Sequence, residues 1–308
     1  MKSIIGHRNP DTDTICSAIA YRALLADQGV EAKVFALGEA NKETKFVLEK
    51  FGVDFPEIVS ELPKDSEIIL IDHNEKAQSI ENLNELDVVE IVDHHKADIK
   101  TDKPIRIHME PLGSSCSIVA KKFIVEGVEI PQEIAQILVA GIISDTLFFR
   151  SPTATPEDRE LMEKLNEVAK IEDLEVLSMG MFDAKSDLGD LSTEDLVKLD
   201  YKQFDFSGHK FGIGVMETTN KDFGLGRKDE MTEVLSEIKK NEGVDGVIFS
   251  IIDILNEEAY TFCSDEEVKK IFAEAFSSED RDGVLYNKGM VSRKKQTVPG
   301  LENHFRNL

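Results

Sequence analysis

The chain contains little cysteine and no long apolar run, and both absences exclude whole classes of protein. Its three cysteines among 308 residues, Cys16, Cys116 and Cys263, are odd in number and far apart. They match neither a disulfide framework nor a paired zinc-ligand pattern, so we expect them to be buried as small apolar side chains. No stretch of about 18 consecutive apolar residues occurs, which excludes a membrane-spanning helix.

Positive charge is also scarce. The 36 Lys and Arg residues face 60 Asp and Glu residues, a formal net charge of −24. Because binding a polyanion needs a basic face that releases counterions, this balance disfavours nucleic acid as a partner, although a local basic pocket could still hold a small phosphate. The opening segment, residues 1–7, lacks the long apolar stretch of a signal peptide. We therefore expect a cytoplasmic protein without membrane contact.

Length and periodicity predict two α/β domains. At about 150 residues per domain the chain has room for two. In its first two thirds short apolar runs alternate with amphipathic stretches, a pattern typical of a parallel sheet with helices on its faces. The segments that carry this pattern are 3–6, 15–26, 32–37, 45–51, 67–71, 88–92, 117–125 and 134–143. They predict an N-terminal doubly wound, mainly parallel sheet with helices on both faces.

A polar segment that begins near Ala184 predicts the domain boundary. We expect a catalytic domain over residues 1–187, a linker over 188–192 and a smaller C-terminal α/β domain over 193–308. Within the second domain, Ser192 and Asp195 have the spacing of a capping box. Strand-like runs at 210–216, 246–253 and 258–263 and helical patterns at 228–240 and 266–276 complete it.

Polar side chains follow several of the apolar runs directly. His7, Asp11 and Asp13 follow the first strand, Asp72 follows the run 67–71, and the triplet Asp93-His94-His95 follows the run 88–92. Another carboxylate, Asp145, comes after the apolar run 134–143. Ligands of a doubly wound sheet bind outside the carboxyl ends of its strands, so we expect these segments to converge.

The types of side chain indicate a metal site. Imidazoles and carboxylates without a thiolate suit Mn²⁺ or Co²⁺, with Mg²⁺ as a substitute. Six such ligands exceed the need of one ion, whereas two ions about 3.5–4 Å apart would use all of them and would hold a bridging water acidified to hydroxide. Each segment alone could instead be a helix cap, a strand-end turn or a solvated terminus. Their joint placement favours the metal site.

A second group of candidate residues is cationic. Ser292-Arg293-Lys294-Lys295-Gln296 places three consecutive cations near the C-terminus of an acidic chain, and an Arg fork beside a Lys suits phosphate oxygens. Lys202 is a weaker candidate for the same role. The alternatives are an exposed basic turn and an ordinary surface lysine.

These motifs together resemble the DHH phosphoesterase superfamily, named for the triplet Asp93-His94-His95, and within it the manganese-dependent family II inorganic pyrophosphatases. The resemblance rests on the His-Arg-Asn-Pro-Asp-Thr-Asp opening, the Asp-His-Asn-Glu segment at 72–75, the triplet, Ser-Asp-Thr at 144–146 and the terminal Ser-Arg-Lys-Lys-Gln. The nuclease-like branch instead carries a glycine-rich C-terminal motif, and this chain contains no Gly-Gly pair.

The resemblance implies hydrolysis of pyrophosphate to two phosphates by direct attack of a hydroxide that bridges two Mn²⁺ or Co²⁺ ions, with Mg²⁺ arriving on the substrate. His7 and Asp11 would hold one metal, Asp13 and His94 the other, Asp72 would bridge them and Asp145 would complete the coordination. His95, Arg293, Lys294 and Lys202 would bind the substrate, and Asp93 would orient its neighbours.

The family resemblance also implies a homodimer formed through the N-terminal domain. Two alternative functions stay open at this point. One is a related DHH phosphoesterase that acts on short oligonucleotides, cyclic dinucleotides or polyphosphate. The other is a non-catalytic protein that binds a metal or pyrophosphate.

Overall fold

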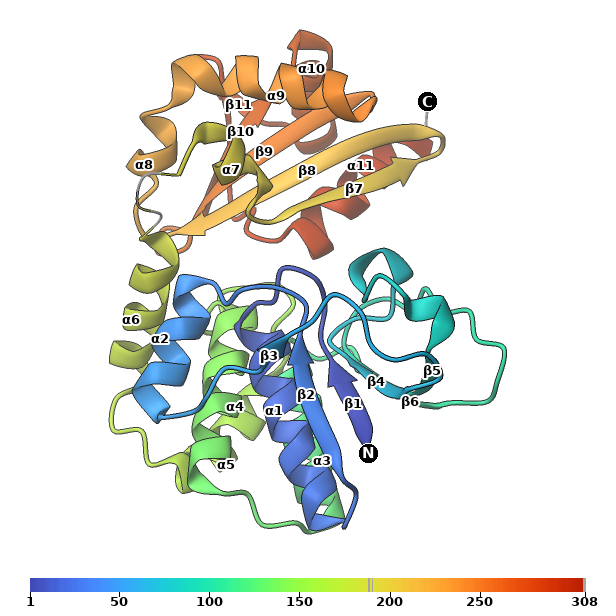
Figure 1. Ribbon diagram of the computed structural model, residues 1–308. Helices are drawn as coiled ribbons and strands as arrows, with labels where there is room; N and C mark the ends of the chain where they lie inside the picture. Colours follow the sequence, from blue (N-terminus) through green and yellow to red (C-terminus); the bar gives the residue numbers. More distant parts are fainter. Residues whose placement is uncertain (188, 190, 307–308) are drawn as a thin grey trace. The chain divides into compact units, whose positions relative to one another are not determined.

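Two compact units make up the chain in the computed structural model, Met1–Ala184 and Lys185–Leu308 (Figure 1). The structure describes residues 1–187, 189 and 191–306. The linker expected at 188–192 therefore includes two positions, 188 and 190, that lie outside the described residues. Each unit has its own sheet and its own core.

The sheet of the first unit has six strands in the order β3-β2-β1-β4-β5-β6, and every neighbouring pair is parallel. Its strands are β1 (Lys2–Ile5), β2 (Ala32–Ala36), β3 (Glu57–Ile58), β4 (Glu67–Ile71), β5 (Asp87–Asp93) and β6 (Arg106–Met109). The strand order reverses between β1 and β4. This switch point is where ligands bind in open α/β sheets.

Six helices and two short 3₁₀ turns belong to the first part of the chain. They are α1 (Thr12–Asp27), α2 (Lys42–Phe51), η1 (Lys76–Gln78), η2 (Leu83–Glu85), α3 (Ser115–Glu126), α4 (Gln132–Thr146), α5 (Pro156–Ala169) and α6 (Leu174–Ser186). Side-chain caps start several of them: Asp11 begins α1, Asn41 begins α2 and Ser114 begins α3. Left-handed Gly52 and Gly127 end α2 and α3.

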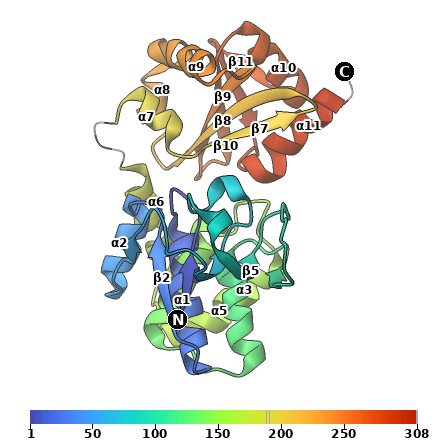
Figure 2. The ribbon, with the colours of Figure 1, turned by 45° about the vertical axis from the view of Figure 1, so that its right-hand side comes forward.

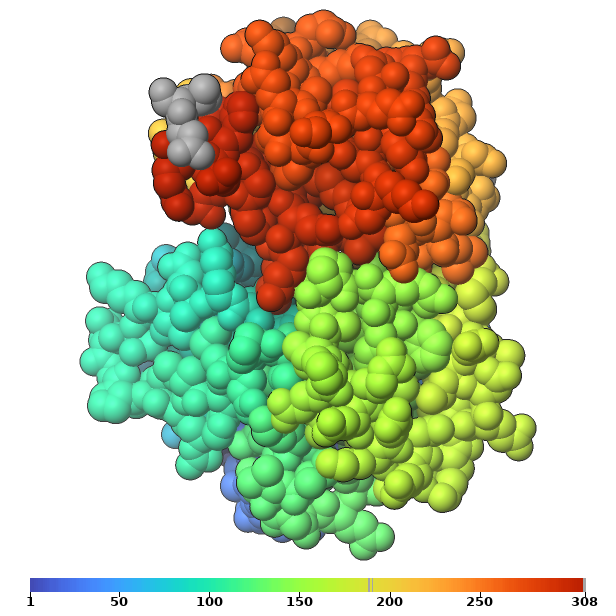
Figure 3. Space-filling view, turned by 180° about the vertical axis from the view of Figure 1, so that it is seen from behind, coloured from blue at the N-terminus to red at the C-terminus, as the bar shows by residue number. Residues whose placement is uncertain are grey.

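Helices cover one face of this sheet. Helix α4 is almost wholly buried and packs against α1, α3 and α5. The last three helices are labelled in Figure 2. On the other face Ile5, Phe35, Ile68, Leu70 and Ile91 form a core with irregular segments and the short turn η2. On the side seen in Figure 3 the teal and green parts of the chain form the surface of this unit, and little of the blue N-terminal part reaches it.

The second unit is built on a mixed sheet in the order β11-β12-β10-β9-β8-β7, in which only the β8–β9 pair is parallel among the strands described. Its strands are β7 (Tyr201–Phe206), β8 (His209–Thr218), β9 (Gly246–Asp253), β10 (Glu258–Cys263), β11 (Glu279–Arg281) and β12 (Val284–Lys288). Its helices are α7 (Thr193–Lys198), α8 (Asp222–Leu225), α9 (Lys228–Glu242), α10 (Glu266–Phe276) and α11 (Val298–Arg306), and the π-helical turn η3 (Arg293–Thr297) precedes the last of these.

Alternating side chains of the second sheet belong to two hydrophobic cores, one on each face of the sheet. Ile213 and Ile248 belong to one, and Met216 and Phe249 belong to the other. The predicted fold class, a parallel α/β sheet followed by a smaller α/β domain, is confirmed. Where helices were expected on both faces of the first sheet, irregular segments and the turn η2 cover the second face among the described residues, because its apolar side chains come from these short connections. All three cysteines are buried, as predicted. Among the described residues no helix combines the length and the apolar character needed to cross a bilayer.

Candidate metal centre

Polar side chains converge at the carboxyl ends of the central strands. His7 follows β1, Asp72 follows β4 and His94 follows β5. Asp11 caps α1 and Asp13 lies in its first turn. Asp145 comes from the last turn of α4. The structure therefore brings together all six residues that the sequence suggests as metal ligands.

Asp72 lies at the middle of this group. Its Oδ2 is 3.4 Å from Nε2 of His7, and its Oδ1 is 3.4 Å from Nε2 of His94. Farther out, Nε2 of His7 lies 3.3 Å from Oδ2 of Asp11, and Nε2 of His94 lies 3.2 Å from Oδ2 of Asp145. Three sets of potential ligands, each within 4.8 Å, result: His7 with Asp11 and Asp72, Asp13 with His94 and Asp145, and Asp72 with His94 and His95.

The two histidine rings present Nε2 to these carboxylates. Nδ1 of His7 lies 2.7 Å from the carbonyl oxygen of Arg8, and Nδ1 of His94 lies 3.0 Å from that of Leu112. A carbonyl oxygen can only accept, so each Nδ1 carries a proton, and the neutral ring then has a lone pair at Nε2. A lone pair this close to carboxylate oxygens repels them unless a proton or a cation lies between. The donor set fits a divalent cation.

Burial and neighbouring carboxylates raise the pKa values of the carboxyl groups in this centre, and neighbouring histidines lower them. Burial raises the pKa of Asp13, and the negative charges of Asp72 and Asp145 raise it further. Burial also raises the pKa of Asp72, but His7, His95 and His94 lower it more, so the net shift is well below the usual range. Burial lowers the pKa of His7, and Asp11 and Asp72 outweigh this and raise it. Such crowding of buried acids favours a bound cation.

Hydroxyl and backbone groups at the start of α3 hold the carboxylates in place. Oδ1 of Asp13 accepts hydrogen bonds from the hydroxyl of Ser114 (2.5 Å) and from the N–H of Cys116 (2.9 Å), and its Oδ2 accepts one from the N–H of Ser115 (2.7 Å). The hydroxyls of Ser115 and Thr14 donate to the two oxygens of Asp72. These serines were not singled out in the sequence, where they appear as an ordinary helix start.

His95 lies beside the centre with its Nδ1 proton engaged elsewhere. Oδ1 of Asp93 accepts from Nδ1 (2.8 Å) and from the backbone N–H (3.0 Å) of His95, while Asn74 donates to Oδ2 of Asp93 over 2.5 Å. Burial raises the pKa of Asp93, but the interaction with His95 lowers it more. Asp93 thus orients His95, whose Nδ1 is 3.8 Å from Asp72.

His73 is a buried histidine that the sequence did not single out. Its Nδ1 lies 2.9 Å from the carbonyl oxygen of Ile71, and its Nε2 has no hydrogen-bond partner among the described residues. Burial lowers the pKa of His73 to about 4. The ring is therefore neutral near pH 7.

The predicted cations lie in the second unit, and two of them, Arg293 and Lys202, lie near Asp200. The guanidinium of Arg293 donates to the carbonyl oxygen (2.7 Å) and to Oδ1 (2.6 Å) of Asp200, and to the carbonyl oxygen of Ile213 (3.1 Å). Partial burial raises the pKa of Asp200, but the charges of Arg293, Lys202 and Lys185 lower it more. Lys294 follows Arg293 in the turn η3. The structure thus places Arg293 and Lys202 near one carboxylate.

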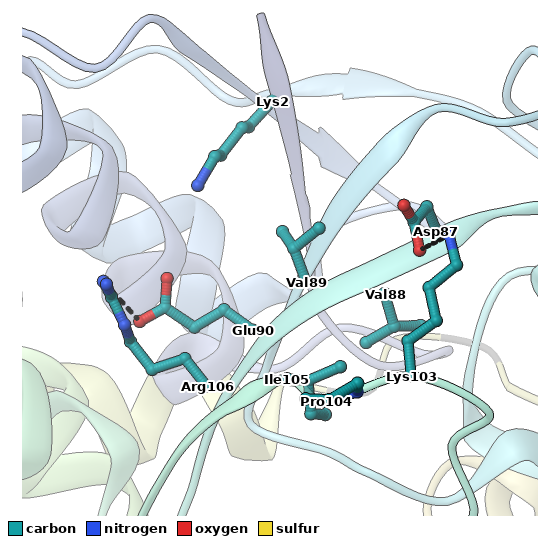
Figure 4. Close-up of a pocket in the computed structure, with 9 residues that line it drawn as sticks. All are labelled: Lys2, Asp87, Val88, Val89, Glu90, Lys103, Pro104, Ile105 and Arg106. Carbon is teal, nitrogen blue, oxygen red and sulfur yellow. Dashed lines mark hydrogen bonds and ion pairs between the residues drawn. The ribbon is translucent and has the colours of Figure 1, made fainter.

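A hollow at the opposite end of the first sheet contains none of the predicted site residues. Figure 4 shows it at the amino ends of β1, β5 and β6, where the ion pairs Arg106–Glu90 (3.9 Å) and Lys103–Asp87 (2.9 Å) partly neutralise its lining. Apolar side chains from 88–89 and 104–105 form the rest. The predicted metal ligands lie instead at the carboxyl ends of the strands of this sheet.

Comparison with known proteins agrees with this arrangement. Residues 3–142 match the DHH family N-terminal domain, and residues 179–304 match the DHHA2 domain. The chain is 41% identical over 310 residues to a probable manganese-dependent inorganic pyrophosphatase of Deinococcus radiodurans, with 99% of each chain covered. It is 38% identical over 313 residues to a manganese-dependent inorganic pyrophosphatase of Methanocaldococcus jannaschii, again with 99% of each covered.

A solved structure shares the whole fold. The crystal structure of a putative family II inorganic pyrophosphatase from Methanococcus jannaschii superposes with a TM-score of 0.88 at 38% identity, and the match covers 99% of this chain and 100% of the other. Fold and site together define a protein with a DHH domain followed by a DHHA2 domain. The chain belongs to the family of manganese-dependent, family II inorganic pyrophosphatases. The resemblance seen in the sequence is confirmed.

Proposed function

We propose that the chain hydrolyses inorganic pyrophosphate to two phosphates. The observation that carries this proposal is the position of Asp72, whose two oxygens each lie 3.4 Å from a different imidazole, His7 and His94. One carboxylate shared between two sets of ligands is what a two-cation site requires. Membership in the pyrophosphatase family supplies the substrate, pyrophosphate.

Two Mn²⁺ or Co²⁺ ions would occupy this centre. His7 and Asp11 would hold one of them, and Asp13, His94 and Asp145 the other, with Asp72 shared. The three ligand sets that meet at Asp72 and His94 support this division. Divalent cations bound there would withdraw charge from phosphoryl oxygens and lower the pKa of a bound water. The hydroxyls of Thr14 and Ser115 keep both oxygens of Asp72 aimed at the centre.

Cationic side chains of this chain would bind pyrophosphate, which would arrive with bound Mg²⁺. Arg293 is held at both terminal nitrogens by Asp200, so its guanidinium has a defined orientation before pyrophosphate arrives. Lys294 and Lys202 would add charge against the developing phosphate oxygens. In the first unit, His95 would donate a hydrogen bond to the leaving phosphate, because Asp93 fixes its ring through Nδ1.

Phosphate release after removal of the metal tests this function. The protein is treated with a chelator, and Mn²⁺, Co²⁺, Mg²⁺ or Zn²⁺ is then added back before pyrophosphate. We expect hydrolysis to stop and to return best with Mn²⁺ or Co²⁺. A binding protein would release no phosphate with any ion. A DHH phosphoesterase of another specificity would cleave a dinucleotide to mononucleotides faster than it hydrolyses pyrophosphate in a parallel assay.

We also propose a homodimer formed through the first unit. Strand β6 is the last strand of its sheet, and its Ile107 is 48% exposed, so a second copy could cover both the apolar side chain and the unpaired backbone groups. The mass measured by light scattering should be twice that of the chain, and Ile107→Glu should lower it to that of the monomer. A reducing compartment such as the cytoplasm fits the three buried, unpaired cysteines.

A further inference from the structure

One peptide group connects His94 to the carboxylate of Asp158, which is neither at a strand end nor part of the DHH triplet. The carbonyl oxygen of Leu112 accepts the Nδ1 proton of His94 over 3.0 Å. The N–H of the same peptide group, on Gly113, donates to both oxygens of Asp158, at 3.0 and 2.9 Å. Asp158 lies in the first turn of α5.

Asp158 is a fully buried carboxylate, and the donors around it are neutral. Besides Gly113, the hydroxyl of Ser117 donates to Oδ1 over 2.6 Å. The N–H and the hydroxyl of Thr155 each donate to Oδ2 over 2.7 Å. The structure describes no Lys, Arg or His side chain paired with Asp158. Its negative charge therefore acts on the dipoles of these donors, and the Leu112–Gly113 peptide group is one of them.

A carboxylate that attracts a peptide N–H shifts electron density toward the carbonyl oxygen of the same group. That oxygen becomes a stronger acceptor for the Nδ1 proton of His94, and an imidazole whose Nδ1 proton is strongly bound is a better metal ligand through Nε2. We propose that Asp158 is a positioning residue that, through the Leu112–Gly113 peptide group, orients the ring of His94 and strengthens its Nε2 toward the cation. The inference rests on the metal centre proposed above.

Tight packing keeps this peptide group from rotating. A Cβ atom on Gly113 would lie 2.7 Å from Cγ2 of Thr146 and 2.9 Å from Oδ2 of Asp158. Thr146 directly follows Asp145, so the peptide group is held between the end of α4, which carries a second candidate ligand, and the start of α5. A displacement of Asp158 would therefore be felt at His94.

The test compares Asp158→Asn with Thr155→Val. The first variant keeps the volume but replaces one accepting oxygen with a donor. The second removes the capping hydroxyl, which accepts from the N–H of Asp158 and donates to its Oδ2, but it keeps the charge of Asp158 and its hydrogen bonds from Gly113. Mn²⁺ affinity is measured without substrate, by electron paramagnetic resonance of the free ion, and the midpoint of thermal unfolding is measured in chelator. We expect Asp158→Asn to weaken Mn²⁺ binding by about 10- to 100-fold, and Thr155→Val to change it less than about twofold.

Equal losses of Mn²⁺ affinity in the two variants, or an unchanged affinity in Asp158→Asn, would overturn the proposal, because a helix cap alone would explain the first result. Because no substrate is present, the outcome does not depend on hydrolysis. If the unaltered chain binds Mn²⁺ but releases no phosphate from pyrophosphate, the proposed function fails and this test still stands.

A second measurement covers the case in which Asp158→Asn does not fold. The unaltered, metal-free protein is labelled with ¹⁵N-histidine and studied by nuclear magnetic resonance. The signals of His94 are those that are missing from the spectrum of His94→Gln. They should show a proton on Nδ1, in a strong hydrogen bond. Ser117→Ala, which removes one donor to Asp158, should move this proton resonance, whereas Thr153→Ala should not. Absence of a proton from Nδ1 of His94, or a resonance unmoved by Ser117→Ala, would contradict the proposal.

Discussion

The hydroxyl of Ser115 donates a hydrogen bond of 2.8 Å to Oδ1 of Asp72. Thr14 does the same for the other oxygen, over 2.5 Å. The shared carboxylate is therefore oriented from two helices, α1 and α3, before any cation binds. Preorientation of this kind is what the outer partners of metal ligands supply.

Removal of one of these hydroxyls should weaken the metal centre without unfolding the chain. We expect Ser115→Ala to lower Mn²⁺ affinity about 10-fold, measured by competition with a chelating dye. Ser178→Ala is the matched control, since Ser178 is also a buried serine but donates to a carbonyl oxygen of its own helix, that of Glu175. Similar affinities in Ser115→Ala and Ser178→Ala would show that the hydroxyl does not orient Asp72.

Asp72→Asn should remove the negative charge of this residue without changing its backbone conformation. Asp72 has φ 61°, a left-handed conformation that Asn tolerates well, so the variant should fold. Loss of the shared carboxylate should lower Mn²⁺ affinity and turnover by at least about 100-fold. Asp65→Asn, at an exposed position with φ 60°, should leave both unchanged. Retention of turnover in Asp72→Asn would exclude Asp72 as the shared ligand.

Arg293→Ala should affect the substrate and spare the metal. We expect kcat/KM for pyrophosphate to fall about 100-fold or more, with the Mn²⁺ content of the purified protein unchanged. Arg281→Ala is the control, because Arg281 is a surface residue of the same unit that pairs with Glu279 at 2.8 Å. An unchanged kcat/KM would remove Arg293 from the proposed substrate site, and a lost Mn²⁺ content would give it a different role.

The second unit should become less stable in acid, in part through Asp253. Burial raises the pKa of this carboxyl, but Lys221, 2.8 Å away, and Asn256 lower it more. A lowered pKa in the folded state stabilises the protein above the ordinary carboxyl range, and this contribution is lost as the pH falls through the lowered value. The free energy of unfolding should therefore decrease as the pH is lowered from about 5.

Asp253→Asn should flatten this dependence and cost about 1–3 kcal/mol at pH 7. Urea unfolding can be followed by tyrosine fluorescence, which reports mainly on this unit, because the chain has no tryptophan and three of its four tyrosines, Tyr201, Tyr260 and Tyr286, lie here. Glu237→Gln, at an exposed position of α9, is the control. A pH profile identical to that of the unaltered chain would show that Asp253 is not responsible.

Much of the fold was predictable because its strands are short apolar runs with clear ends. The predicted run 67–71 is β4, and 246–253 and 258–263 are β9 and β10. That His7, Asp72 and His94 lie close together was also predictable, since parallel strands present their carboxyl ends at one edge of the sheet. Helix α3 begins at Ser115, two residues before the predicted start at 117, because its first turn is polar and lacks the apolar signal.

The partners of these residues were not predictable from the sequence. Ser115 and Asp158 are residue types that start helices, and nothing local distinguishes a cap from a group that contacts a distant site. Asp158 reaches His94 only through a peptide group on a third segment. Such connections depend on tertiary packing, which is not encoded in any short window of residues.

The two thiols nearest the centre, Cys16 and Cys116, have a practical consequence for metal exchange. Burial raises the pKa of both, and the charge of Asp13 raises each further, so they stay protonated at neutral pH. Soft ions such as cadmium bind thiolates, not thiols, and Sγ of Cys116 packs directly against Gly141, where there is no room for a Cβ atom. Cadmium added to this protein would therefore have to bind through the oxygen and imidazole ligands of the centre rather than through a thiolate.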